Sequence, residues 1–184
     1  MYPTQIVMGV KELRKDKFNA IINTDLKPFG GLWSSTYIPG EKRYVSDWVR
    51  MAEGISKDWL SNDFVIFDVK DDAKIYEVNS VDKYFELVEK YHMALEKGIS
   101  KESIKLPDFE AMSRDLDIIW FTAPLIHQVK NPFFLASRHE DKPFKEIMQE
   151  LCIMTTLMSL DAESSLIMNF DVIKSQKYLY VNLV

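Results

Sequence analysis

Cysteine is almost absent from this chain, because Cys152 is the only one among 184 residues. A lone cysteine excludes an intramolecular disulfide and a cysteine-based zinc cluster, and it favours a reducing compartment. The three histidines are far apart, and none has the second histidine four residues on that a helical zinc site requires. The chain also lacks a glycine-rich dinucleotide fingerprint, a phosphate-binding loop and a Gly-x-Ser-x-Gly motif. We therefore expect no metal site and none of these common enzyme signatures.

Positive charge is in deficit, with 23 Lys and Arg against 28 Asp and Glu and a net charge of −5. The surface lacks the basic excess that attracts phosphate backbones, so nucleic acid is a disfavoured partner. The longest stretches free of charge, 28–40 and 118–129, are shorter than the ~18 apolar residues that cross a bilayer. Residues 1–10 show no secretion signal. We therefore expect a soluble cytoplasmic protein. Since 47% of its residues are hydrophobic, we also expect a true core.

Glycine and proline are few, six and seven, and no linker or low-complexity segment divides the chain. We therefore expect one domain over residues 1–184. Periodicity predicts helices over 46–60, 80–98, 108–116 and 143–158, and strands over 4–10, 32–38, 64–69, 73–78, 117–122 and 163–172, with a last strand near the C-terminus. Segments 64–69 and 73–78 are predicted to form a hairpin or two nearby strands. Helices and strands are mixed along the chain without a regular βαβ repeat, which favours the α+β class.

Segment 27–37 (KPFGGLWSSTY) is the most distinctive stretch of the chain. Its two adjacent glycines allow another backbone or a flat ligand to approach closely. Strand alternation then places Trp33, Ser35 and Tyr37 on one face and Ser34 with Thr36 on the other, so only one serine points into a given cleft. The competing interpretation is a tight turn that leads into a core strand with a buried tryptophan. Glu163 opens the polar face of a late strand, and the competing interpretation of this residue is a solvated edge carboxylate.

Four short segments, in their order along the chain, resemble the landmarks of the ADP-ribosyltransferase superfamily. They are 6–10 (IVMGV), 30–36 (GGLWSST), 46–48 (SDW) and 163–164 (ES). In that superfamily a first strand supplies a His or Arg followed by Gly, a second supplies hydroxyl and aromatic residues around the nicotinamide, and a late strand supplies a catalytic Glu. The resemblance therefore implies split antiparallel sheets with flanking helices, NAD as the substrate, no metal, and a protein as the target or partner.

The resemblance also implies roles for individual residues. A carboxylate at position 163 would stabilise the oxocarbenium-like transition state that forms when the nicotinamide–ribose bond breaks, and it would bind a ribose hydroxyl. The serines would orient that carboxylate or the substrate, an aromatic side chain would stack on the nicotinamide, and the early glycine would bind its amide. The implied catalytic residues are Glu163, Ser34 and Ser35, and the implied NAD-binding residues are Met8, Gly9, Gly31, Trp33 and Tyr37.

Two other functions stay open at this point. Met8 stands where the superfamily has His or Arg and cannot donate to the ribose, which motivates a non-catalytic binding or inhibitor module of the same fold. A hydrolase that uses a carboxylate pair, Asp108 with Glu110 or Asp115 with Asp117, is a further candidate. The acceptor of ADP-ribose and the oligomeric state are not determined by the sequence.

Overall fold

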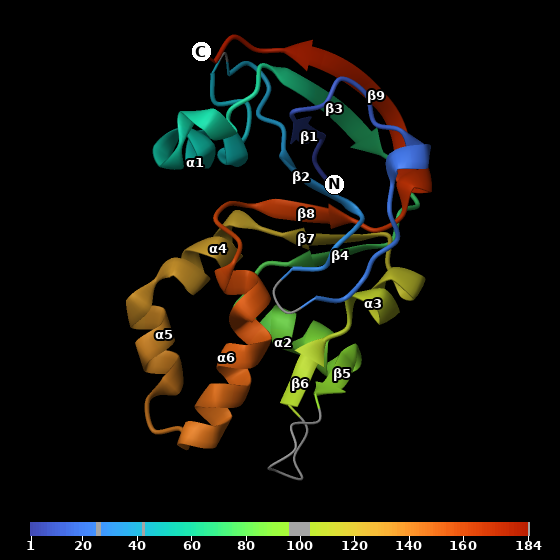
Figure 1. The fold of residues 1–184 in the computed structure, drawn as a ribbon. Coiled ribbons are helices and arrows are strands. Elements are labelled where there is room, and N and C mark those ends of the chain that lie inside the picture. Colours follow the sequence, from blue (N-terminus) through green and yellow to red (C-terminus); the bar gives the residue numbers. More distant parts are fainter. Residues whose placement is uncertain (25–26, 42, 96–103, 184) are drawn as a thin grey trace.

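The protein is built around a curved seven-stranded sheet (Figure 1). The structure, a computed structural model, describes residues 1–24, 27–41, 43–95 and 104–183. The order of strands in the sheet is β4-β7-β8-β2-β1-β3-β9, and β5 pairs with β6 in a separate two-stranded sheet. The strands are β1 Gln5–Met8, β2 Leu32–Thr36, β3 Asp63–Val69, β4 Ile75–Val78, β5 His92–Leu95, β6 Ile104–Pro107, β7 Ile118–Phe121, β8 Ser164–Ile167 and β9 Ile173–Tyr180.

The large sheet is mixed and mostly antiparallel, because only β4 and β7 run parallel to each other. Strands β3 and β9 arch over the other strands in Figure 1. The face inside this curve, called the inner face below, carries an apolar cluster in which Val7 and Val65 from one half of the sheet join Ile118 and Ile167 from the other. The sheet therefore closes partly around its own side chains.

Helices cover the opposite, outer face of the sheet. Their bounds among the described residues are α1 Asp47–Ile55, α2 Val81–Lys90, α3 Phe109–Asp115, α4 Ala123–Lys130, α5 Pro132–His139 and α6 Phe144–Met158, with short 3-10 turns at Lys15–Lys17, Lys57–Trp59 and Phe170–Val172. Apolar residues of α2, α4 and α6 pack against Ile119, Phe121 and Leu166 of the sheet. Ser46, Ser80 and Asp108 cap their helices, each accepting a hydrogen bond from the backbone three residues on.

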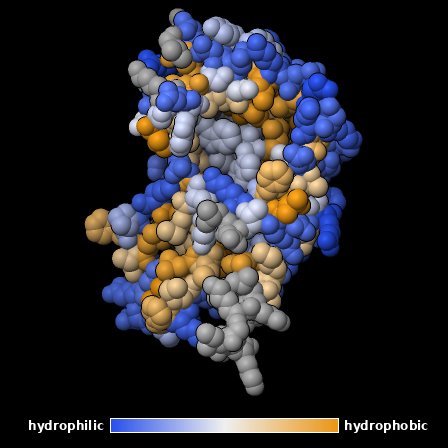
Figure 2. All heavy atoms as spheres, in the orientation of Figure 1, coloured by the Kyte–Doolittle hydropathy of each residue, from blue (hydrophilic) through white to orange (hydrophobic). Residues whose placement is uncertain are grey.

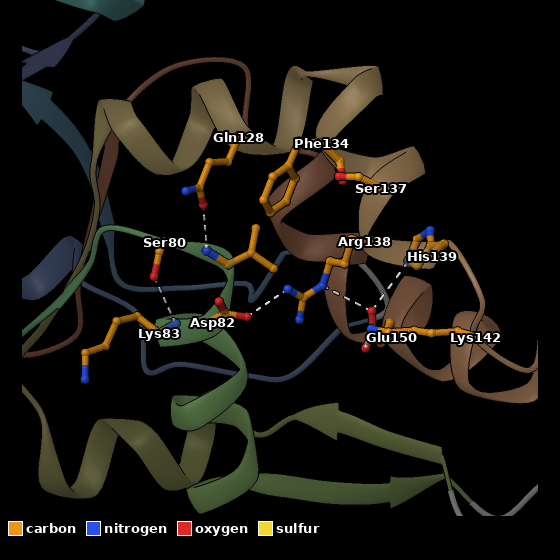
Figure 3. Close-up of polar contacts among 11 residues, drawn as sticks. Ser80, Asp82, Lys83, Gln128, Phe134, Ser137, Arg138, His139, Lys142 and Glu150 are labelled. Carbon is orange, nitrogen blue, oxygen red and sulfur yellow. Dashed lines mark hydrogen bonds and ion pairs between the residues drawn. The ribbon is translucent and has the colours of Figure 1, made fainter.

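Helix α5 contains no fully buried residue; Phe134 and Leu135 pack partly on the core, and ion pairs hold its C-terminal end (Figure 3). The Arg138 guanidinium lies between α2 and α6, with Nη1 2.7 Å from Asp82 Oδ1 and Nε 3.1 Å from Glu150 Oε2. Lys142 Nζ lies 2.6 Å from the other Glu150 oxygen. Glu150 is largely buried, so this carboxylate is stabilised by two cations and ties the α5 end to the helical layer.

The long helix predicted over 80–98 is wrong in its second half. Helix α2 ends at Lys90, and β5 begins at His92 and pairs with β6. Tyr91 leaves the helical conformation, with φ −129 and ψ 87, and its hydroxyl donates to Asp115 at 2.8 Å. Antiparallel pairing with β6, the next strand along the chain, therefore overrides the helical periodicity, while Gly98 lies outside the described residues.

Three other predicted elements differ in their bounds or position, and α4, α5 and β6 were not predicted. The helix predicted over 46–60 ends at Ile55 and is followed by a separate 3-10 turn. The strand predicted over 163–172 ends at Ile167, before a 3-10 turn begins. Strands β3 and β4 lie far apart in the sheet rather than forming a hairpin or lying near each other.

The α+β class is confirmed by this arrangement. The parallel β4–β7 pair departs from the split antiparallel sheets that the resemblance implied. Across the described ranges, no helix is long and apolar enough to cross a membrane.

Candidate functional site

A polar cluster occupies one end of the inner face, next to the apolar cluster. Strand pairing places Ser34 opposite Ser165, and Ser165 opposite Trp120, so these three side chains lie on the same side of the sheet. Gln5 is paired with Thr36, which adds both residues to that side. Four neighbouring strands, β7, β8, β2 and β1, therefore supply the cluster, and Glu163 stands directly before β8.

The carboxylate of Glu163 is fixed through one oxygen. Its Oε1 accepts a hydrogen bond from the Thr36 hydroxyl and another from the Trp120 indole N–H, each at 2.6 Å. No described side chain donates to the second oxygen, Oε2, and no Lys, Arg or His of the described residues forms an ion pair with Glu163. The residue is only 8% exposed. Glu163 is thus an oriented carboxylate without a bound cation, not a solvated edge residue.

Burial raises the pKa of Glu163 above the usual range of a glutamate, because desolvation disfavours the charged form. The hydrogen bonds from Thr36 and Trp120 act in the opposite direction, and the negative charge of Asp47 raises the pKa further. The carboxylate is therefore held in a place that favours the uptake of a proton or of a neighbouring positive charge.

Two cavities lie beside this carboxylate and share Asp161 and Ala162 in their walls. The first, about 220 Å³, lies between the N-terminal turns of α1 and α4 and is lined by Asp47, Arg50, Ala123, Ile126, His127, Asp161, Ala162 and Glu163. The second, about 260 Å³, is lined by Lys27, Trp33, Trp48, Met51, Asp161, Ala162 and Ser164. Figure 2 shows the outline of the molecule hollowed at the left, between α1 and α4. Glu163 therefore borders space that a ligand can enter.

The two serines of β2 face opposite sides of the sheet. Ser34 lies on the inner face with Glu163 and donates a hydrogen bond of 2.8 Å to Gln5 Oε1. Ser35 is paired with Ile6 on the outer face, and its hydroxyl is buried without a hydrogen-bond partner in the structure. The hydroxyl that orients Glu163 belongs instead to Thr36, two residues after Ser34. The structure thus brings Ser34 beside Glu163 and separates Ser35 from it.

Three other candidate residues lie away from Glu163. Met8 packs in the outer-face cluster around Ile6 and Phe64. Gly9 is four residues beyond Gln5, the residue level with Glu163, and this spacing corresponds to about 13 Å along a strand. Gly31 precedes β2 at the end opposite Thr36, and its N–H donates to Asn19 O at 2.9 Å. The inner-face residue of β1 level with Glu163 is Gln5, so Met8 does not occupy that position.

The two aromatic candidates on β2 are placed differently from each other. Trp33 lines the larger of the two cavities, stacks on Phe121 with ring centroids 6.2 Å apart, and lies under the Lys27 ammonium at 5.7 Å. Tyr37 packs in the outer-face cluster with Ile6 and Val45. Of the two, only Trp33 presents its ring to a cavity next to Glu163.

Four residues of the cluster, Gln5, Thr36, Trp120 and Ser165, were not among the sequence candidates. Thr36 could have been found, because it alternates with Ser34 on the polar face of the same strand. Trp120 lies in an apolar run that reads as a buried strand, and nothing in that run indicates that its indole N–H reaches a carboxylate. Gln5 is the first residue of β1, and no motif marks it.

The carboxylate pairs considered for a hydrolase have structural hydrogen bonds. Asp108 caps α3, and Glu110 accepts the backbone N–H of Asn23. Asp115 accepts the Tyr91 hydroxyl, and Asp117 accepts the backbone N–H of Lys74. Over the part of the chain that the structure describes, no group of three or more His, Cys, Asp or Glu side chains is arranged to hold a metal ion.

Replacing Glu163 with glutamine is expected to raise the thermal stability of the protein at pH 7. A raised pKa means that the folded state favours protonated Glu163. The contribution of this group to the stability of the folded state is fully present below the ordinary glutamate pKa, about 4.3, and is lost as the pH rises through the raised pKa. The amide has no charge to desolvate, so the gain in Tm should shrink towards zero near pH 4. Thermal melts between pH 4 and 8 measure it, with Glu12→Gln as the exposed control. A Glu163→Gln protein that melts below the wild type at pH 7 contradicts this expectation.

No family model, no curated protein and no solved structure matches this chain. The chemistry available at the Glu163 site therefore has to be inferred from its own residues.

Proposed function

We propose that the protein is an NAD-dependent ADP-ribosyltransferase, and the observation that carries this proposal is Glu163. A carboxylate that is buried, held through one oxygen and unpaired with a cation can stabilise positive charge that develops next to it. Cleavage of the nicotinamide–ribose bond develops such a charge on the ribose. Oε2 is the oxygen left to accept a ribose hydroxyl, because no described side chain donates to it, and Glu163 is one of the residues that line a cavity.

The proposed reaction breaks one bond to the ribose carbon and forms another. The C–N bond between ribose and nicotinamide breaks, and its electron pair leaves with the nicotinamide. The acceptor nucleophile then forms a bond to the ribose carbon and loses its proton, or water does so in the hydrolytic reaction. Glu163 lowers the barrier by opposing the positive charge on the sugar, while Thr36 and Trp120 keep the carboxylate in place.

The arrangement of strands supports the same proposal. Three of the four segments that resemble the superfamily landmarks lie on or next to β1, β2 and β8, and the fourth opens α1. The three strands are neighbours in the sheet although they are up to about 160 residues apart in the sequence. Trp33 and Trp48 line the cavity that adjoins the Glu163 cavity and offer aromatic surface to a nicotinamide ring.

A non-catalytic binding module of the same fold is the second candidate, and Gln5 is the observation that favours it. The inner-face residue of β1 level with Glu163 is an uncharged amide rather than a His or Arg. Calorimetry that detects tight binding to a protein partner, together with no heat on addition of NAD, would favour this candidate.

The direct test is incubation of the purified protein with NAD. Nicotinamide release is followed by chromatography, and transfer is followed with NAD labelled in its adenylate part in the presence of candidate acceptor proteins. Release of nicotinamide at a rate above the background hydrolysis of NAD supports the enzyme. Absence of release at high protein concentration overturns it.

Replacing Thr36 with valine is expected to lower kcat for nicotinamide release by roughly 10- to 100-fold, because a misplaced catalytic group loses about this much. Valine keeps the shape of threonine but removes the hydroxyl that donates to Glu163 Oε1. KM should change much less than kcat, since Thr36 acts through Glu163. The matched control is Thr155→Val on α6, where the hydroxyl donates only to the preceding helical turn. Equal rates for Thr36→Val and the wild type would contradict the positioning role.

A further inference from the structure

The ring of Tyr2 covers the Glu163 site from the segment that precedes β1. It meets the Trp120 ring edge-on, with centroids 5.6 Å apart and planes at 88°. Its hydroxyl is buried and lies close to Glu163 and Ser165. Burial raises the pKa of Tyr2, and the negative charge of Glu163 raises it further. The phenol is thus a neutral ring with one hydroxyl, held against a tryptophan beside a carboxylate.

The closed arrangement leaves polar atoms unsatisfied. The Tyr2 hydroxyl faces the hydroxyls of Ser165 and Ser34, but neither the phenol nor the completely buried Ser165 hydroxyl has a partner at hydrogen-bond distance and angle. Buried hydroxyl groups without partners destabilise the state that contains them. A sugar brings several hydroxyls to the same space and can satisfy both groups, which a single phenol does not do.

The segment that carries Tyr2 is held by the packing of the Tyr2 ring on Trp120 and the inner-face apolar cluster, and by few polar contacts. Its polar attachment before Thr4 is the Pro3 carbonyl, which accepts a hydrogen bond of 3.2 Å from Gln5 Nε2, and the side chain of Met1 is fully exposed. From Thr4 onward the backbone is fixed, because Thr4 O accepts the N–H of Tyr37 at 2.9 Å. Residues 1–3 can therefore move away without breaking the sheet.

We propose that Tyr2 occupies the place of the substrate's ribose, and that a ribosyl ligand binds on Trp120 when residues 1–3 move away. A tryptophan ring next to a carboxylate and serine hydroxyls is a surface suited to a sugar ring with two adjacent hydroxyls. This inference rests on the proposed function, since it uses the same Glu163, and it adds a built-in competitor to that site.

The test compares the affinity of Tyr2 variants for ADP-ribose, which carries the ribose but no nicotinamide to release. Tyr2→Ala removes the competing ring, so the affinity of this variant for ADP-ribose is expected to be about tenfold higher than that of the wild type. The reason is that the open, binding-competent state of the protein becomes more populated. Tyr2→Phe keeps the ring and removes the unpartnered hydroxyl. It should close the site more firmly, with a higher Tm and an affinity about threefold lower than the wild type. Tyr178→Ala, at an exposed tyrosine of β9, is the matched control.

The direction of the changes decides between a competitor and a residue that binds the ligand. A ligand-binding Tyr2 would make both variants weaker, so a loss of affinity in a folded Tyr2→Ala protein overturns the proposal. If Tyr2→Ala does not fold, an unchanged affinity in Tyr2→Phe overturns it. ADP-ribose binding that follows the expected pattern, without nicotinamide release from NAD by any variant, would preserve this inference and remove the enzyme. Nicotinamide release from NAD, together with ADP-ribose affinities that do not differ between the Tyr2 variants and the wild type, would support the enzyme and overturn this inference.

Discussion

Replacement of Glu163 with glutamine should lower kcat for nicotinamide release by roughly 100- to 1000-fold, the usual effect of removing one group that stabilises charge in the transition state. Glutamine has the shape of glutamate, and its Oε1 can still accept hydrogen bonds from Thr36 and Trp120. The substitution therefore removes the negative charge and leaves the packing. The amide nitrogen that replaces Oε2 cannot accept the ribose hydroxyl, so KM should rise, but by less than kcat falls, because the negative charge acts mainly on the transition state.

Steady-state kinetics of nicotinamide release measure this effect. The matched control is Glu77→Gln, because Glu77 is paired with Trp120 on the same face of the sheet but is exposed. Glu163→Asp keeps the charge on a shorter side chain and should give an intermediate rate. Equal rates for Glu163→Gln and the wild type would remove Glu163 from the mechanism and the proposed reaction with it.

Replacement of Gly30 with alanine should destabilise the fold by roughly 2–5 kcal/mol, the sum of a left-handed backbone conformation and a steric overlap in a packed region. Gly30 has φ +85, and a Cβ atom there would lie 2.0 Å from the backbone oxygen of Ala20. That backbone cannot easily yield, because the adjacent Asn19 O accepts the N–H of Gly31 at 2.9 Å. In a chain of this length the loss corresponds to roughly 4–20 °C in Tm.

Gly40→Ala is the control for Gly30→Ala. Gly40 has φ +86, and a Cβ atom there would meet nothing within 4 Å. Its substitution should therefore show only the conformational term, about 1–2 kcal/mol. Chemical denaturation of both variants separates the two contributions. Equal losses at the two glycines would show that the close approach of the Ala20 backbone contributes nothing.

Much of the secondary structure follows from local patterns. The strand formers after the diglycine predict β2, and the capping residues Ser46, Ser80 and Asp108 predict where three helices begin. The end of α2 was missed because apolar spacing continues through His92 and Leu95, whereas strand pairing with β6 decides the conformation there. Local signals identify segments, but they do not say which distant strand a segment will meet.

The site was predicted in part. Glu163 and Ser34 were named from the sequence, and the structure places both on the inner face. Alternation along β2 showed that Ser34 and Ser35 face opposite sides, but it could not show which side carries Glu163. Met8 was chosen for its neighbour Gly9, whereas the pairing of β1 with β2 places Gln5 level with Glu163.

The sequence alone determined the α+β class, the burial of an apolar core and the presence of an acid at the start of a late strand, because composition and periodicity act over short distances. Only the tertiary structure decided that Thr36 and Trp120 orient that acid and that Tyr2 covers it. These contacts join residues that lie up to about 160 positions apart, and their geometry depends on strand order, register and curvature, which no local pattern encodes.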